Sequence, residues 1–106
     1  MDAKARTRYQ HRALVMKALA HPTRLFLVDR IAERKTCVCE LAALVGADVS
    51  TVSRHLSILK NAGIVTDEKR GNQVFYSIRV RCVLNWYTCV EGVLEASVQE
   101  QLQAVR

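Results

Sequence analysis

Cysteine is the residue type in this sequence with the most reactive side chain, and four cysteines are present: Cys37, Cys39, Cys82 and Cys89. Their chemistry depends on the compartment. The segment from Met1 to Arg12 is polar, and no apolar run approaches the ~18 residues of a membrane span. We therefore expect a cytoplasmic protein with no membrane partner, whose reduced thiols are free, bind metal or act as redox switches instead of forming structural disulfides.

The spacing of Cys82 and Cys89 argues against a metal site made by these two thiols alone. They lie seven residues apart, hence on the same face of a helix but about 10 Å apart along its axis. One ion cannot bridge that separation, because its sulfur ligands lie ~2.3 Å from it. Each thiol therefore either finds a metal-binding partner on another element or subunit, or packs as a buried interface residue.

The composition indicates one folded domain with an affinity for anions. A length of 106 residues is typical of a single domain and excludes a two-domain enzyme. Half of the residues are hydrophobic and only one is proline, which excludes a disordered or collagen-like chain. The 16 Lys and Arg residues exceed the 10 Asp and Glu residues, and the resulting net charge of +6 favours a polyanion as a partner.

Helical periodicity and capping residues predict the elements that position these thiols. Two helices are expected in the first third of the chain, with Pro22 in the first turn of the second. A short helix over 38–45 then ends at Gly46, and Asp48 is a suitable N-cap for a longer helix over 49–62. A short helix, a tight turn and a capped second helix form a helix-turn-helix pattern.

The last third of the chain predicts a β-hairpin and a long helix. Residues 64–78 alternate as two strands around a glycine-containing turn, which is a wing. A final helix over 81–104 would be roughly 35 Å long and carries more apolar side chains than one face needs. The predicted fold class is therefore mainly α with a small β-hairpin: one winged helix-turn-helix domain over 1–106 that forms a homodimer through its terminal helices. The expected interface residues are Val83, Trp86, Val90, Val93 and Leu94.

The helix over 49–62 has the side chains of a DNA recognition helix. Hydroxyl and basic residues lie off its apolar stripe, and no acidic residue occurs between Val49 and Gly63. Such side chains reach base edges and phosphates in the major groove of double-stranded operator DNA. The wing tip adds basic and amide groups, although Asp67 and Glu68 weaken the local field and a solvated turn is an equal alternative. The predicted DNA contacts, led by Ser53, Arg54 and His55, are Ser50, Thr51, Ser53, Arg54, His55, Lys60, Lys69, Arg70, Asn72 and Gln73.

Five segments between residues 21 and 78 carry a resemblance to a known family. They are His21-Pro22-Thr23-Arg24, Cys37-Val38-Cys39-Glu40-Leu41, Val52-Ser53-Arg54-His55-Leu56, Leu59-Lys60-Asn61-Ala62-Gly63-Ile64-Val65 and Gly71-Asn72-Gln73-Val74-Phe75-Tyr76. Through these segments the sequence resembles the ArsR/SmtB family of winged-helix metalloregulatory repressors. The resemblance implies a repressor whose metal-free homodimer binds operator DNA and releases it when a thiophilic ion binds cysteine thiolates. It implies no enzyme, and a Cys/His hydrolase would need a nucleophile beside a base in a pocket.

The resemblance also implies that Cys37 and Cys39 match the metal-binding motif of the arsenic- and cadmium-type members. Side chains two residues apart on a regular helix point about 200° away from each other, so the pair holds one ion only if the first turn unwinds. That distortion would tilt the recognition helix and lower its affinity for DNA. Two thiolates favour As(III) or Sb(III) as inducer, with Cd(II), Pb(II) or Zn(II) as alternatives and cysteine oxidation as a rival signal.

The sequence departs from these relatives in its third ligand. Ala42 stands where some arsenic-sensing members have a further cysteine, and no cysteine precedes Cys37 as in cadmium-sensing members. Cys82 and Cys89 are the remaining candidates, and packing is expected for Cys89 because it lies near the expected dimer axis. The histidine and carboxylate ligands of zinc-sensing relatives are largely missing, since the aligned positions are Val80, Cys82, Val93 and Ala96.

Overall fold

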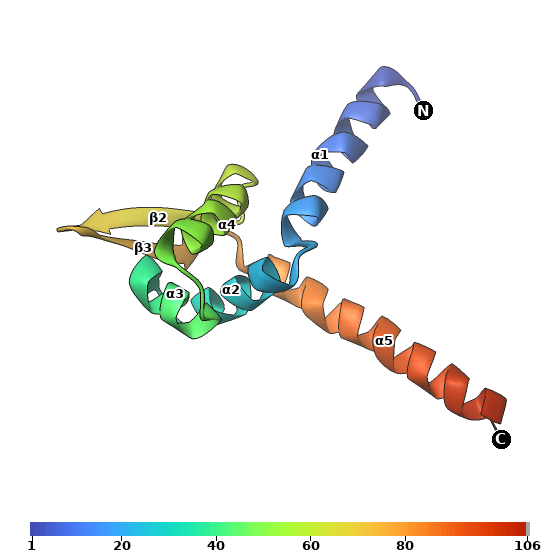
Figure 1. Cartoon of the computed structure of the whole chain (residues 1–106). Helices are drawn as coiled ribbons and strands as arrows, with labels where there is room; N and C mark the ends of the chain where they lie inside the picture. Colours follow the sequence, from blue (N-terminus) through green and yellow to red (C-terminus); the bar gives the residue numbers. More distant parts are fainter. Residues whose placement is uncertain (106) are drawn as a thin grey trace.

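The computed structural model describes residues 1–105, so Arg106, the last residue of the expected domain, lies outside them. Within this range, the helices in the middle of the chain pack against a small antiparallel sheet (Figure 1). The α-helices are α1 (Ala3–Leu19), α2 (Pro22–Glu33), α3 (Val38–Val45), α4 (Val49–Asn61) and α5 (Leu84–Val105), the last preceded by a 3-10 turn, η1 (Arg81–Val83). The strands are β1 (Thr36–Cys37), β2 (Val65–Arg70) and β3 (Gln73–Ile78).

Capping groups start and stop the helix-turn-helix where the sequence indicates. Gly46 ends α3 with a φ of 79°, a left-handed conformation that glycine adopts without strain. Asp48 then caps α4, and its carboxylate accepts a hydrogen bond from the Thr51 amide at 2.8 Å. Hydrogen bonds from Thr51 hold the pKa of Asp48 below its ordinary value, so the cap is ionised at neutral pH.

The core lies between the end of α1, α2, α3, α4 and the sheet, and it confirms the predicted winged helix-turn-helix class. Apolar side chains from each of these elements meet there, as the hydrophobic periodicity requires. The largest fully buried side chains are Leu27 and Val28 of α2, Leu41 of α3, Val52, Leu56 and Leu59 of α4, and Val65 of β2.

The sheet has a third strand that the sequence does not predict. The strand order is β1-β3-β2, with both pairs antiparallel, so β1 extends the expected hairpin on its β3 side. Two residues are too few to show alternation, which explains why periodicity misses β1. Thr36 is nevertheless buried, and its hydroxyl donates to the Arg34 carbonyl at 2.7 Å. The strand therefore joins the end of α2 to the wing.

Helices α1 and α5 extend away from this body in different directions (Figure 1). Only the start of α5 packs on the core, through Leu84 and Tyr87, and Val83 just before it does the same. Beyond that point α5 has no buried residue, and its apolar side chains are exposed. Across residues 1–105 no helix is long and apolar enough to cross a membrane. The exposed apolar side chains of α5 are Trp86, Val90, Val93, Leu94, Val98, Leu102 and Val105.

Candidate functional site

Helix α4 carries six of the ten predicted DNA-contact residues, and four of these six are exposed. Val52, Leu56 and Leu59 point into the core, which leaves the other side of the helix open to solvent. Arg54 is exposed and, among residues 1–105, has no carboxylate within ion-pair distance. Its charge is therefore available to a polyanion. The neighbouring predicted contacts Ser50 and Thr51 are also exposed, and Ser53 is half-buried.

His55 lies differently from the other predicted contacts. Its ring centroid is 4.5 Å from that of His21, and its Nδ1 atom is 3.2 Å from Nη1 of Arg24. The expectation of a groove-facing histidine does not fit this arrangement, because the ring is half-buried and turned toward α2. Burial, followed by the charges of His21, Arg24 and Arg54, lowers the pKa of His55 below its ordinary value.

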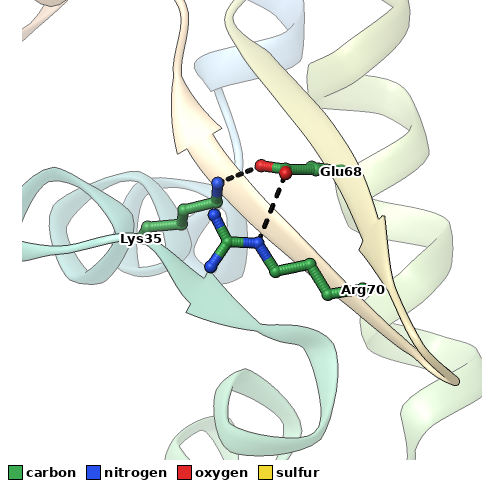
Figure 2. A network of polar contacts seen from close by, with 3 residues as sticks. All are labelled: Lys35, Glu68 and Arg70. Atoms are coloured by element: carbon green, nitrogen blue, oxygen red, sulfur yellow. Dashed lines mark hydrogen bonds and ion pairs between the residues drawn. The ribbon is translucent and has the colours of Figure 1, made fainter.

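Ion pairs neutralise the acidic residues of the wing. Glu68 on β2 accepts from Nζ of Lys35 and, at 3.3 Å, from Nε of Arg70 (Figure 2). Asp67 lies 3.0 Å from Nζ of Lys60. The hydrogen bond from Lys35, with a smaller effect of Arg70, lowers the pKa of Glu68. Glu68 and Asp67 therefore hold the predicted DNA-contact residues Arg70 and Lys60 in place, and they also weaken the positive electrostatic field of these two cations.

The remaining predicted contacts at the wing tip are free of these pairs. Lys69, Asn72 and Gln73 are exposed around the turn between β2 and β3. Arg70 stays exposed as well, with its guanidinium 5.6 Å from the Phe75 ring centroid. The turn thus presents one unpaired cation and two amides to solvent.

Cys37 and Cys39 lie where the sheet meets the helix-turn-helix. Cys37 is the last residue of β1 and the N-cap of α3, with an extended backbone (φ −79°, ψ 156°). Cys39 is exposed in the first turn of α3. Strand pairing with β3 holds Cys37 outside α3, which begins at Val38. The 200° separation of side chains two residues apart on a regular helix therefore does not apply to this pair.

The two thiols lie at the N-terminal end of α3. Cys37 makes no side-chain hydrogen bond to the first-turn amides of α3. Glu40 in the same turn is paired with Arg34. Two thiols fit a soft ion as partial ligands, but no group of three His, Cys, Asp or Glu residues positioned for a metal occurs within residues 1–105. Further ligands would have to come from solvent, the inducer itself or a second subunit.

The two other thiols lie on a different part of the molecule. Cys82, in η1, is exposed at a hollow of about 320 Å³ between α1 and α5, beside Arg12, Met16 and Trp86. Cys89 is exposed on α5. The part of the chain that the structure describes does not bring either thiol into a metal-binding group with Cys37 and Cys39.

Sequence reasoning missed two residues that organise these surfaces. Nothing in the local sequence of Lys35 indicates a partner 33 residues away at Glu68. Arg24 lies on α2 and contacts His55 on α4, 31 residues away. The available signal for Arg24 was its place in the His-Pro-Thr-Arg segment that carries the family resemblance.

Comparisons with known proteins agree with this arrangement. The family model described as bacterial regulatory protein, arsR family, matches residues 21–67. A transcriptional repressor SmtB homolog of Synechocystis sp. is 38% identical over 83% of this chain and 67% of its own length. The cadmium resistance transcriptional regulatory protein CadC of Listeria innocua is 39% identical over 65% of this chain and 59% of its own length.

A solved structure extends the similarity to the whole fold. The homodimeric winged helix-turn-helix DNA-binding domain of a possible ArsR-family regulator from Mycobacterium bovis superposes with a TM-score of 0.80. It is 26% identical, and the match covers 94% of this chain and 93% of that one. Fold, recognition helix and wing thus define a DNA-binding transcriptional regulator, not an enzyme. The chain belongs to the ArsR/SmtB family of transcriptional repressors.

Proposed function

We propose that this chain forms a homodimer that represses transcription in the absence of inducer. It releases its operator when a thiophilic ion, As(III) or Sb(III), binds Cys37 and Cys39. The observation that carries the proposal is the location of these two thiols, one at the end of β1 and one in the first turn of α3. Both residues are adjacent to elements that meet DNA in a winged helix-turn-helix.

The ligand chemistry supports a soft, low-coordinate ion. Two thiolates without a nearby histidine favour ions that prefer sulfur over nitrogen and oxygen. As(III) and Sb(III) need few protein ligands, whereas Cd(II), Pb(II) and Zn(II) would require more donors than the two thiols supply. The CadC relative is named for cadmium resistance, so Cd(II) is the first alternative inducer. Cys82 and Cys89 join this proposal only as third ligands from a partner subunit.

The structure supports a route from the thiols to both DNA-binding elements. An ion bonded to both sulfurs would constrain their separation. Cys37 is paired with Phe75 of β3, and Lys35, two residues earlier, is bound to Glu68 of β2. Movement of β1 toward Cys39 therefore acts on the wing, while movement of α3 acts on α4, which packs against it. This route couples inducer binding to DNA affinity without a helix turn having to unwind.

The DNA surface that we propose combines α4 with the wing tip. Arg54, with Ser50, Thr51 and Ser53, faces the major groove, and Lys69, Asn72 and Gln73 contact the flanking backbone or minor groove. Lys60 and Arg70 contribute positive charge that their carboxylate partners reduce. The homodimer forms through the exposed apolar side of α5, where Trp86, Val90, Val93 and Leu94 lie.

The test is inducer-dependent release of DNA by cysteine variants. Cys37→Ser and Cys39→Ser should each bind the operator upstream of the gene as wild type does, but should lose release by As(III) and Sb(III). Both substitutions remove a sulfur ligand from an exposed or half-buried position without touching the surface of α4. Gel shifts with a reductant present throughout, and with Cd(II), Pb(II) and Zn(II) in parallel, identify the ion.

Matched controls are Cys82→Ser and Cys89→Ser, which remove a thiol outside the proposed site. Each control variant should still release the operator, and at most it should need a higher inducer concentration than wild type does. Normal release in Cys37→Ser, together with its loss in Cys82→Ser or Cys89→Ser, would move the sensor to α5. Release by an oxidant, and by none of the ions under reducing conditions, would replace metal sensing with thiol redox sensing.

A further inference from the structure

Arg24 connects three helices at one point. Its Nε atom donates to the carbonyl oxygen of Ala18 at 2.6 Å, and its Nη2 atom donates to that of Lys17 at 3.4 Å, both near the end of α1. Its Nη1 atom lies 3.2 Å from Nδ1 of His55 on α4. Because Arg24 belongs to α2, one side chain ties the recognition helix to the junction of α1 and α2.

The contact between Arg24 and His55 defines the protonation state of the imidazole. A guanidinium carries only N–H donors, so Nδ1 of His55 has to accept and the ring proton has to be on Nε2. A proton on Nδ1 would set one N–H against another and add a positive charge beside Arg24. The contact therefore exists only while His55 is neutral.

The surroundings of His55 keep it neutral. His21 at the N-cap of α2 and Arg24 of α2 face it, and Arg54 is its neighbour on α4. From α1, Lys17 and His11 line the groove that also contains Arg24. Burial, His21 and the two arginines all lower the pKa of His55, so protonation requires a pH below the ordinary histidine value of about 6.5.

His21 adds a second reason for a defined ring position. Its Nδ1 atom accepts a hydrogen bond from the Thr23 amide at 3.1 Å and so caps α2. The capping bond fixes the His21 ring, against which the His55 ring lies at 4.5 Å. His55 is therefore held on one side by the helix cap and on the other by the guanidinium.

We propose that Arg24 and His55 are positioning residues for operator binding. The bond between the guanidinium and the neutral imidazole fixes α4 against the junction of α1 and α2, and thereby sets the angle at which α4 enters the major groove. His55 acts from the side of α4 that faces α2, while the adjacent and exposed Arg54 contacts DNA. Acidification breaks the bond and lowers operator affinity, independently of the inducer.

The sign of the pH dependence tests this assignment. Operator affinity is measured by fluorescence anisotropy with a labelled duplex at constant ionic strength, from about pH 8 to about pH 5.5, a range that brackets the ordinary histidine pKa. Wild type should lose about two- to ten-fold in affinity as the pH falls, the value of one hydrogen bond. A groove-facing His55 would give the opposite sign, since protonation would add a positive charge next to phosphates.

Variants separate positioning from general acid effects. In His55→Gln the amide oxygen accepts from Arg24 but does not titrate, so this variant should bind like wild type at pH 8 and lose the acid-dependent fall. The matched control His11→Gln removes a histidine of α1 and should keep the fall. Arg24→Ala should bind about two- to ten-fold more weakly at every pH, with circular dichroism verifying that it is folded.

Two results would overturn the proposal. The first is a gain in wild-type affinity on acidification. The second is a His55→Gln variant with the same pH profile as wild type, which would assign the fall to another group. The comparison of His55→Gln with wild type does not depend on Arg24→Ala. The proposal therefore remains testable even if Arg24→Ala does not fold.

Discussion

Leu94 offers the most direct measure of the proposed dimer interface. It lies in the middle of α5 and is 60% exposed, within the apolar side of a helix that has no buried residue. A leucine so exposed in the monomer becomes buried when a second α5 covers it. Leu94→Ala removes most of this apolar surface and leaves the core untouched, because Leu94 does not belong to it.

The size of the effect follows from the exposed fraction. Full burial of a leucine side chain is worth ~1.5–3 kcal/mol, and 60% of it remains to be buried, so each copy contributes about 1 to 2 kcal/mol. A two-fold symmetric interface contains the substitution twice, so the free energy of dimerisation becomes less favourable by about 2 to 4 kcal/mol per dimer. The dimer Kd should therefore rise about 30- to 700-fold.

Sedimentation across nanomolar to micromolar concentrations measures this Kd. The matched control is Leu44→Ala, since Leu44 is 51% exposed on α3, away from α5. It should leave the Kd within about two-fold of wild type. Comparable Kd values for both variants would mean that the middle of α5 is not the interface. Operator affinity should also be lower in Leu94→Ala, because a weaker dimer binds the two half-sites of the operator less well.

Two further predictions concern the DNA surface and its link to the thiols. Arg54→Ala should weaken operator binding by about 1 to 3 kcal/mol. The control Arg106→Ala removes the same charge outside the described residues and should have little effect in the same gel shift. Equal losses of affinity in both variants would mean that the DNA surface lies elsewhere. Lys35→Met, which keeps the aliphatic stem but frees Glu68, should raise the As(III) concentration for half-release by at most about five-fold, the value of a surface ion pair. If the As(III) concentration for half-release is unchanged, the ion pair between Lys35 and Glu68 does not transmit inducer binding to the wing.

The sequence predicts the winged helix-turn-helix because each of its elements has a local signal. The apolar stripe of α4, its Asp48 cap and Gly46 before it are all within a few residues of one another, so periodicity and capping suffice. The strand β1 has no such signal, because two residues show no alternation. Its existence depends on a partner strand about 40 residues later in the chain.

The side-chain arrangement of the site is predictable only in part, for the same reason. The thiol pair is recognisable from its spacing, but its geometry depends on the pairing of Cys37 with β3. His55 has the sequence position of a groove residue, and only the approach of Arg24, 31 residues away, turns it inward. The sequence shows which residue types occur on a helix. The direction in which a side chain such as His55 points depends on contacts with elements that are distant in the sequence.

Under the proposed function, the location of the thiols outside the buried core makes inducer preference separable from folding. The buried core is built from α1, α2, α3, α4 and the sheet without any of the four cysteines. Ala42, where some arsenic-sensing relatives have a third cysteine, is only 4% exposed, but Ala43 is exposed and lies one turn beyond Cys39. A new ligand at Ala43 would join the thiols from the solvent side. If the proposed thiol site binds the inducer, surface substitutions beside it would change the ion that is detected for biosensor use, while the scaffold and its operator stay the same.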